Sequence, residues 1–117
     1  MGAGCEVRVS VDDDGGIVLH VVGELDLATV SVLRDALSSL PQIGARRVVL
    51  DVSELAFISA AGVRVALEAQ RQLARDGGQL VLRGPSALLM RVLQATEVDQ
   101  EFEIDKRRDG TPAGWTG

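Results

Sequence analysis

The sequence predicts an α/β fold, with a small mixed β-sheet that has a parallel core and is packed by helices. Through the middle of the chain, apolar segments typical of strands alternate at short spacing with segments of helical periodicity. This order implies right-handed crossovers between parallel strands. Ahead of them, two strand-like segments flank a turn with two glycines, which adds an antiparallel hairpin. The 117 residues can bury one core. We expect one domain over residues 1–105 and a flexible tail over residues 106–117.

Composition and charge narrow the classes of partner. The net charge is −5 and the aromatic residues are Phe57, Phe102 and Trp115, so neither phosphate contacts nor base stacking is favoured. We therefore expect no nucleic-acid partner. Cys5 is the single cysteine, which suits a reducing compartment. No apolar stretch has the length needed to span a bilayer, so we expect a cytoplasmic protein without direct membrane insertion.

The first two strands are predicted from different apolar patterns. Valines alternate with polar residues over 7–11, as in a half-exposed strand at a sheet edge. Residues 17–22 are apolar on both faces, as in an interior strand. This second strand contains His20, for which we expect a structural role rather than a catalytic or metal-binding one. Residues 12–16 between them are predicted to form a solvated turn and not a metal site, because the acids are adjacent instead of alternating.

A first helix is predicted after the second strand. Its apolar stripe consists of Leu33, Ala36, Leu37 and Leu40. Asp26 or Thr29 can cap its N-terminus. Pro41 stops it, because proline cannot continue the backbone hydrogen bonds of a helix.

The next strand and helix form the segment around which the fold is organised. Residues 48–50 are a β-branched run typical of a strand covered on both faces. We expect Phe57 and Ile58 to be buried, Ser59 to cap a helix, and this helix to begin near Ala60. Its buried stripe is predicted to contain Val63, Ala66, Leu67, Leu73 and Ala74.

The last third of the domain repeats the pattern on a smaller scale. Residues 79–83 are predicted to form a strand, and Pro85 suits the first position of a short helix. The apolar face of this helix consists of Leu88, Leu89, Val92 and Leu93. Residues 101–104 alternate again, as in a last strand at a sheet edge. The two predicted edges, 7–11 and 101–104, leave homodimerisation open.

The motifs of common enzyme classes are not found in the sequence. Nucleophilic catalysis needs a serine or cysteine, a base and an orienting group, but the only histidine, His20, lies within a predicted strand. No Walker-type phosphate loop or dinucleotide-binding glycine motif occurs. Asp26 and Asp51 both follow strands, but the sequence does not fix the separation that decides whether they could act as a pair. We expect no enzymatic activity, no cofactor and no metal.

Three segments together resemble a known family. Residues 23–26 read GELD, residues 48–53 read VVLDVS, and residues 57–63 read FISAAGV. In order, spacing and flanking hydrophobicity they resemble the STAS domain over residues 6–104, and within it the bacterial anti-sigma factor antagonists. The resemblance implies a small mixed sheet packed with helices. It also implies binding to an anti-sigma factor with a serine-kinase fold, which releases a sigma factor for transcription.

The sequence departs from this family at its regulatory position. The family has Asp-Ser-Ser-Gly at the start of the second helix, and its first serine accepts phosphate, which switches the antagonist off. Here Ala60 stands at that serine position and Ser59 at the aspartate position. Alanine has no hydroxyl, so the resemblance implies an antagonist locked in its unphosphorylated, binding form. Phosphorylation of Ser59 is the alternative, but serine is a strongly preferred helix cap, and we favour the cap.

These residues define a candidate partner-binding site. It consists of Asp26, Ser59, Ala60, Ala61, Gly62, Val63 and Arg64. For Val63 an inward, core position is at least as well supported. Two other functions stay open. One is a STAS accessory subunit of a membrane transporter, and the other is a sensor of a small ligand or nucleotide at the loop formed by Asp26 and residues 59–62.

Overall fold

The computed structural model describes residues 4–13, 15–40, 44 and 46–106. Within these residues the chain forms six strands, three α-helices and one 3-10 turn. In chain order they are β1 (Cys5–Val11), β2 (Ile17–Leu25), α1 (Val30–Ser38), β3 (Arg47–Asp51), β4 (Leu55–Ile58), α2 (Ala60–Arg75), β5 (Gln79–Arg83), α3 (Ala87–Ala95), the 3-10 turn η2 (Asp99–Glu101) and β6 (Glu103–Asp105).

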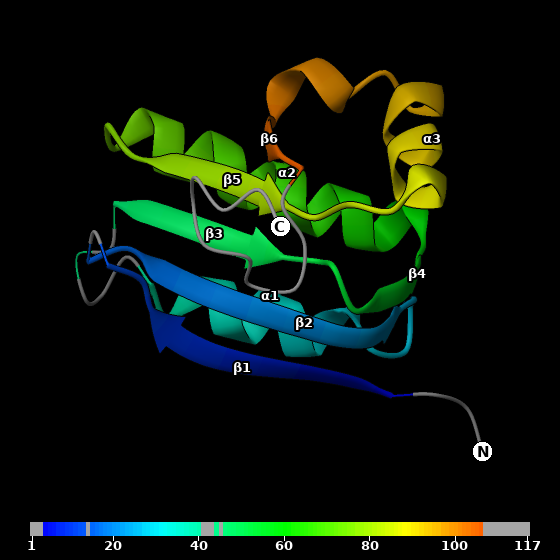
Figure 1. Cartoon of the computed structure of the whole chain (residues 1–117), viewed down its shortest axis with the longest axis horizontal. Coiled ribbons are helices and arrows are strands. Elements are labelled where there is room, and N and C mark those ends of the chain that lie inside the picture. The colour runs from blue at the N-terminus through cyan, green and yellow to red at the C-terminus, as the bar shows by residue number, and fades with distance from the viewer. Residues whose placement is uncertain (1–3, 14, 41–43, 45, 107–117) are drawn as a thin grey trace, which may run out of the picture.

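All six strands belong to one mixed sheet, which confirms the predicted α/β class (Figure 1). The strand order is β1-β2-β3-β5-β6, and only the β1–β2 pair is antiparallel. β4 pairs in parallel with the C-terminal end of β2, beyond the part of β2 that pairs with β3. The central strands therefore end together, next to the point where β4 delivers the chain to α2.

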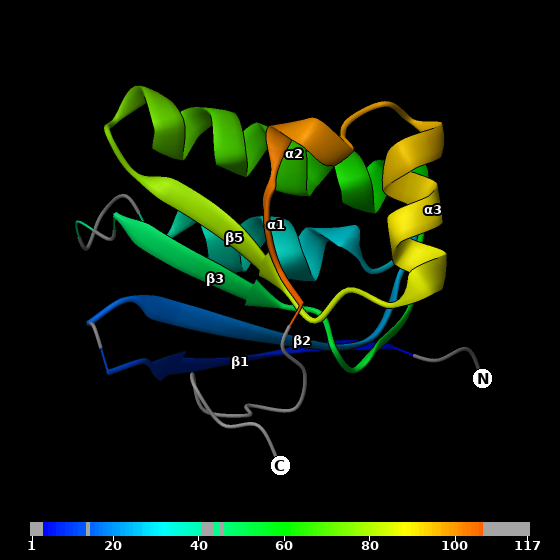
Figure 2. The ribbon, with the colours of Figure 1, turned by 45° about the horizontal axis from the view of Figure 1, so that its top comes forward.

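The main core lies between the sheet and the layer formed by α1 and α2 (Figure 2). Alternate residues of the central strands point into it, and each helix adds its apolar stripe, as in Leu33 and Leu37 of α1. Leu19, Val48 and Leu80 are fully buried there. Most buried residues of this core are Val and Leu, and Phe102 is the one buried aromatic among the described residues.

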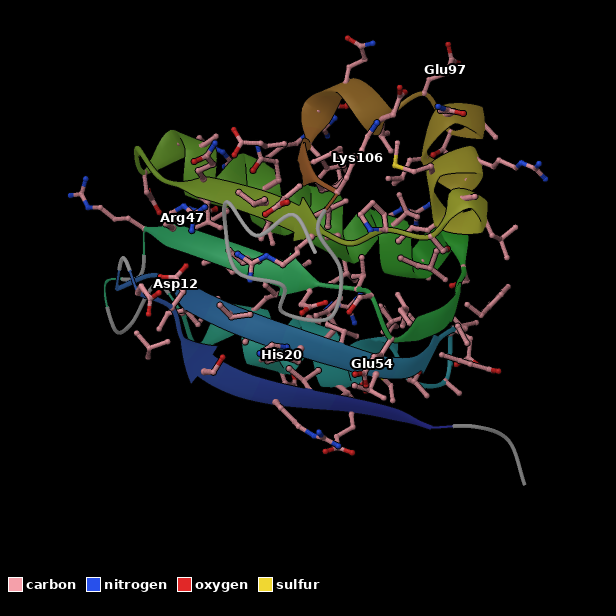
Figure 3. The ribbon with its side chains drawn as sticks, viewed as in Figure 1. Asp12, His20, Arg47, Glu54, Glu97 and Lys106 are labelled. Carbon is pink, nitrogen blue, oxygen red and sulfur yellow. The ribbon has the colours of Figure 1, made fainter. Side chains whose placement is uncertain are left out.

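The second face of the sheet has a small apolar centre with a polar surround. Val18, Val49 and Val81 form the buried centre. Arg47 Nη1 pairs with Asp12 Oδ2 at 3.0 Å at the end of the sheet where Figure 3 labels both residues. The second Asp12 oxygen accepts a hydrogen bond from the N–H of Gly16, so the carboxylate closes the β1–β2 turn and ties it to β3.

The segment between β3 and α2 differs from the prediction. Residues Leu55–Ile58 form the strand β4, which sequence periodicity did not identify because it has only four residues. Phe57 was expected to be buried, but 46% of its surface is exposed. β2 also continues to Leu25, three residues beyond the predicted end, with a register shift between Gly23 and Glu24.

Smaller corrections concern the helices. In α2, Val65 is buried and Ala74 is exposed, although Ala74 was placed in the buried stripe. Ser86, not Pro85, occupies the start of α3, where its side chain accepts a hydrogen bond from Leu89 N as an N-cap. Leu88 was assigned to the apolar face of α3 but is 56% exposed. The last strand is Glu103–Asp105, and the predicted tail lies outside the described residues apart from its first residue.

Candidate protein-binding site

The N-terminus of α2 begins directly at the end of β4, as expected from the sequence. Ser59 has an extended backbone and caps the helix, since its Oγ accepts a hydrogen bond from Gly62 N at 3.4 Å. Its own N–H donates to Leu25 O at 2.8 Å, which fastens the cap to the end of β2. The hydroxyl that could take a phosphate is thus engaged in starting the helix. The structure thus contains the helix cap that the sequence predicted at Ser59.

Asp26 lies in the loop that follows β2, directly after Leu25, the residue whose carbonyl accepts the Ser59 N–H. Its Oδ1 accepts hydrogen bonds from the N–H groups of Ala28 and Thr29, both at 3.0 Å. Thr29 Oγ1 in turn accepts from Asp26 N at 2.9 Å and donates to Glu24 O at 2.7 Å. The Thr29 side chain makes no capping bond to α1 itself. Asp26 therefore shapes the β2–α1 loop, and the structure brings this loop beside the start of α2.

Gly62 and Val63 face inward. A methyl group at position 62 would lie 2.8 Å from Ile58 Cγ1 and 3.2 Å from Leu25 Cβ. The close approach that Gly62 allows is therefore internal, between the first turn of α2 and the strand ends. Val63 is only 4% exposed and belongs to the core, which decides the alternative that the sequence left open for its side chain.

The outward residues of this turn are Ala60 and Arg64, while Ala61 is half-buried. The neighbouring segments carry exposed apolar side chains that the sequence did not assign to the site. Leu27, in the Asp26 loop, is 82% exposed, and Phe57, two residues before Ser59, is 46% exposed. Leu88 shares with Phe57 an apolar pocket between β4 and α3. Clustered exposed apolar groups are typical of protein-binding surfaces. For Phe57, the signal in the sequence was the apolar run LAFI over residues 55–58, which is too short to assign alone.

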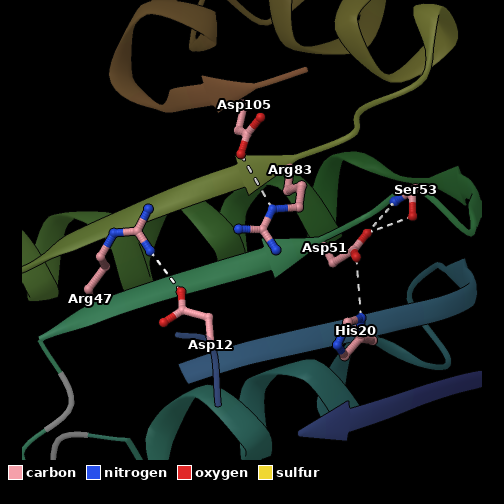
Figure 4. Close-up of polar contacts among 7 residues, drawn as sticks. All are labelled: Asp12, His20, Arg47, Asp51, Ser53, Arg83 and Asp105. Carbon is pink, nitrogen blue, oxygen red and sulfur yellow. Dashed lines mark hydrogen bonds and ion pairs between the residues drawn. The ribbon is translucent and has the colours of Figure 1, made fainter. Parts of the chain in front are cut away.

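A second set of polar residues lies on the other face of the sheet (Figure 4). Ser10 Oγ lies 3.0 Å from His20 Nε2, and His20 Nδ1 lies 3.2 Å from Asp51 Oδ2. Ser53 holds Asp51 in place through its N–H at 3.0 Å and its hydroxyl at 2.6 Å. Hydroxyl, imidazole and carboxylate thus occur in the order of a nucleophilic triad.

This row of side chains has a structural explanation that needs no catalysis. It ties β1, β2 and β3 together across the polar face, and it satisfies Asp51, which is only 5% exposed. Asp26 and Asp51 each have their own partners, Asp26 within the β2–α1 loop and Asp51 in His20 and Ser53.

No helix in the described part of the chain has the length and apolar character to cross a membrane. Comparison with known proteins gives the family. Residues 9–105 match the family model described as Mlab, STAS domain. BtrV of Bordetella bronchiseptica, named as an anti-sigma factor antagonist, is 39% identical over 102 residues, which cover 87% of this chain and 88% of BtrV. The anti-sigma-B factor antagonist of Bacillus subtilis is 27% identical over 109 residues, which cover 89% of this chain and 97% of that protein.

Solved structures share the fold. An anti-sigma factor antagonist from Mycobacterium paratuberculosis matches with a TM-score of 0.74 and 26% identity, over 88% of this chain and 86% of that one. SpoIIAA, a Bacillus cell fate determinant, matches in its phosphorylated form with a TM-score of 0.67 and 22% identity, over 85% of this chain and 90% of SpoIIAA. Because the family model spans nearly the whole domain and its relatives by sequence are anti-sigma factor antagonists, this chain belongs to the STAS domain family.

Proposed function

We propose that this chain is an anti-sigma factor antagonist that binds an anti-sigma factor of serine-kinase fold and so releases a sigma factor. The observation that carries the proposal is the first turn of α2, where Ala60 is exposed directly after the capping Ser59. Leu27 and Phe57 supply apolar contact area near this turn. A partner that covers Ala60, Leu27 and Phe57 would bury uncharged groups at low desolvation cost.

The same position explains why phosphate would not regulate this protein in the usual way. The related fold of SpoIIAA has been solved in unphosphorylated and phosphorylated forms, so that protein takes a phosphate. A phosphoserine carries close to two negative charges at neutral pH. In a contact surface it would act by repulsion and by the cost of removing its water. Ala60 has no hydroxyl to modify, and Ser59 Oγ is already used by the helix cap. We infer a constitutively binding form.

The experiment measures binding of the purified chain to the kinase-fold anti-sigma factor of the same organism by calorimetry, before and after incubation with ATP. We expect the same affinity in both conditions and no phosphate on the chain by mass spectrometry. Ala60→Ser should become a phosphate acceptor and lose affinity in ATP. Ala60→Asp should bind at least about tenfold more weakly without ATP, because it buries a charge in the interface.

Ala74→Asp is the matched control, because Ala74 is exposed near the other end of the same helix. Its affinity should stay within about twofold of the parent. Phosphate on Ser59 of the parent would show that regulation by phosphorylation is retained, at the residue before Ala60. Copurification with transporter subunits, without affinity for the anti-sigma factor, would instead favour a transporter accessory subunit. A rise in melting temperature with nucleotide alone would favour a ligand sensor.

A further inference from the structure

β1 leaves one side of its backbone without a partner among the described strands. It has seven residues, Cys5–Val11, and pairs only with β2. The opposite edge strand, β6, has three residues. Short edge strands offer little for another chain to pair with, whereas a long one is a template for strand addition. Of these two edges, β1 is therefore the one long enough to pair with a strand of another chain.

Two hydrogen bonds show which backbone groups of β1 face outward. Asp12 N donates to Gly16 O at 2.9 Å at one end of the pair, and Glu24 N donates to Gly4 O at 3.1 Å at the other. In an antiparallel pair, bonded positions alternate with positions that point away from the partner. The hydrogen bonds at both ends of the pair therefore indicate that the even-numbered residues of β1 form the backbone hydrogen bonds to β2. The backbone groups of Cys5, Val7, Val9 and Val11 therefore point away from the sheet.

The side chains along this edge are apolar on one face and charged on the other. Val9 and Val11 are 64% and 66% exposed although they lie on the face that carries the helices and the main core. Val32 of α1, the helix that packs near β1, is 39% exposed. On the opposite face, Arg8 Nε bonds Glu6 Oε2 at 2.6 Å, and both side chains are largely exposed. The edge thus carries apolar area and one charge of each sign.

We propose that two copies of this chain pair through β1, as antiparallel strands related by a two-fold axis at Val7, to form one continuous sheet. This register places each Glu6 opposite the partner's Arg8, so both charges gain an opposite neighbour. It places Cys5 opposite the partner's Val9 on the apolar face. An axis at Arg8 would set like charges opposite each other, and an axis at Val9 would leave Arg8 opposite the partner's Ser10.

This pairing does not involve the surface at the start of α2. Its test is therefore independent of the test of the proposed function. A β1–β1 contact would cover Val9 and give the outward backbone groups of Cys5, Val7 and Val9 hydrogen-bond partners. Figures 1 and 2 both show β1 as the outermost strand, on the side of the sheet opposite β6. The contact is isologous, since each strand presents the same residues to the other.

Sedimentation equilibrium of the full chain tests the pairing. We expect a reversible monomer–dimer equilibrium in the parent. Val9→Glu should raise the dissociation constant at least about tenfold by placing a charge in the apolar contact. Leu88→Glu is the control, because Leu88 is a comparably exposed apolar residue away from β1, and it should leave the constant within about twofold. A monomer at every concentration, or equal effects of the two variants, would overturn the proposal.

Charge reversal and cross-linking test the register. Arg8→Glu should weaken the dimer about fivefold or more by opposing like charges, and adding Glu6→Arg should restore it. Val9→Cys should oxidise to a disulfide with the partner's native Cys5, since facing residues in such a pair lie about 5.5 Å apart at Cα, within disulfide range. Peptide mapping that finds position 9 joined to position 9 would overturn the axis at Val7, as would no rescue by the double reversal.

Discussion

The acidity of the Cys5 thiol depends on its burial and on its position near Asp26. Burial raises the pKa of its thiol above the ordinary value, and the negative charge of Asp26 raises that pKa further. The folded chain therefore holds this proton more tightly than the unfolded chain does. The resulting stability is fully present below the unfolded pKa, about 8.5, and is lost as the pH rises through the higher folded pKa.

The measurement is the rate of Cys5 alkylation against pH, in buffer and in urea. We expect the midpoint in buffer to lie above the midpoint in urea. Asp26→Asn should lower the midpoint only in part, because burial is the larger cause and remains. Equal midpoints in both conditions would contradict the prediction. A midpoint unchanged by Asp26→Asn would show that the carboxylate does not influence the thiol from its loop.

At the scale of the elements, α2 docks on the strand ends through Gly62. Gly62→Ala adds a methyl group 2.8 Å from Ile58 Cγ1, closer than real contacts allow. Alanine favours a helix interior by up to about 1 kcal/mol over glycine, but overpacking costs about 1–3 kcal/mol. We expect the free energy of unfolding to fall by about 1–2 kcal/mol in urea titrations.

A double-mutant cycle isolates the cause of that loss. In an Ile58→Ala background the methyl group at position 62 has room, so Gly62→Ala should cost much less or stabilise the fold. Gly4→Ala is the control, because no atom lies within 4 Å of the position where its methyl group would be. Additive effects of the Gly62 and Ile58 substitutions would show that the two residues do not compete for space.

The elements also show how far sequence reasoning reaches. Long periodic segments such as α2 were predicted to within a residue at their start, because Ser59 and the apolar stripe give independent signals. β4 was not predicted, since four residues carry too little periodicity, and its pairing with β2 depends on contacts distant in sequence. Because β4 was not identified, the sequence also predicted wrongly that Phe57 is buried. The row of Ser10, His20 and Asp51 exists only once β1, β2 and β3 are aligned.

For the whole molecule, the sheet order implies a gradient of local stability. β2, β3 and β5 are paired on both sides and contribute fully buried residues such as Leu19, Val48 and Leu80. Opening any of them breaks two ladders and exposes the core, so their amides should exchange with solvent only through global unfolding. β6 is short and paired on one side, so its amides should exchange through local opening at a much lower free energy.

Amide hydrogen exchange by NMR, in dilute protein, measures this gradient. In β1 we expect slow and fast amides to alternate, with Arg8 and Ser10 protected by β2 and Val7 and Val9 open to water. Equal protection along β1, or β6 amides as slow as those of β3, would contradict the expected order. The gradient bears on binding, because the α2 turn is anchored on the ends of β2 and β4 through Ser59 N and Gly62. The proposed binding turn is thus tied by its backbone to the ends of two strands, so a partner at Ala60 would need to order this turn little on binding.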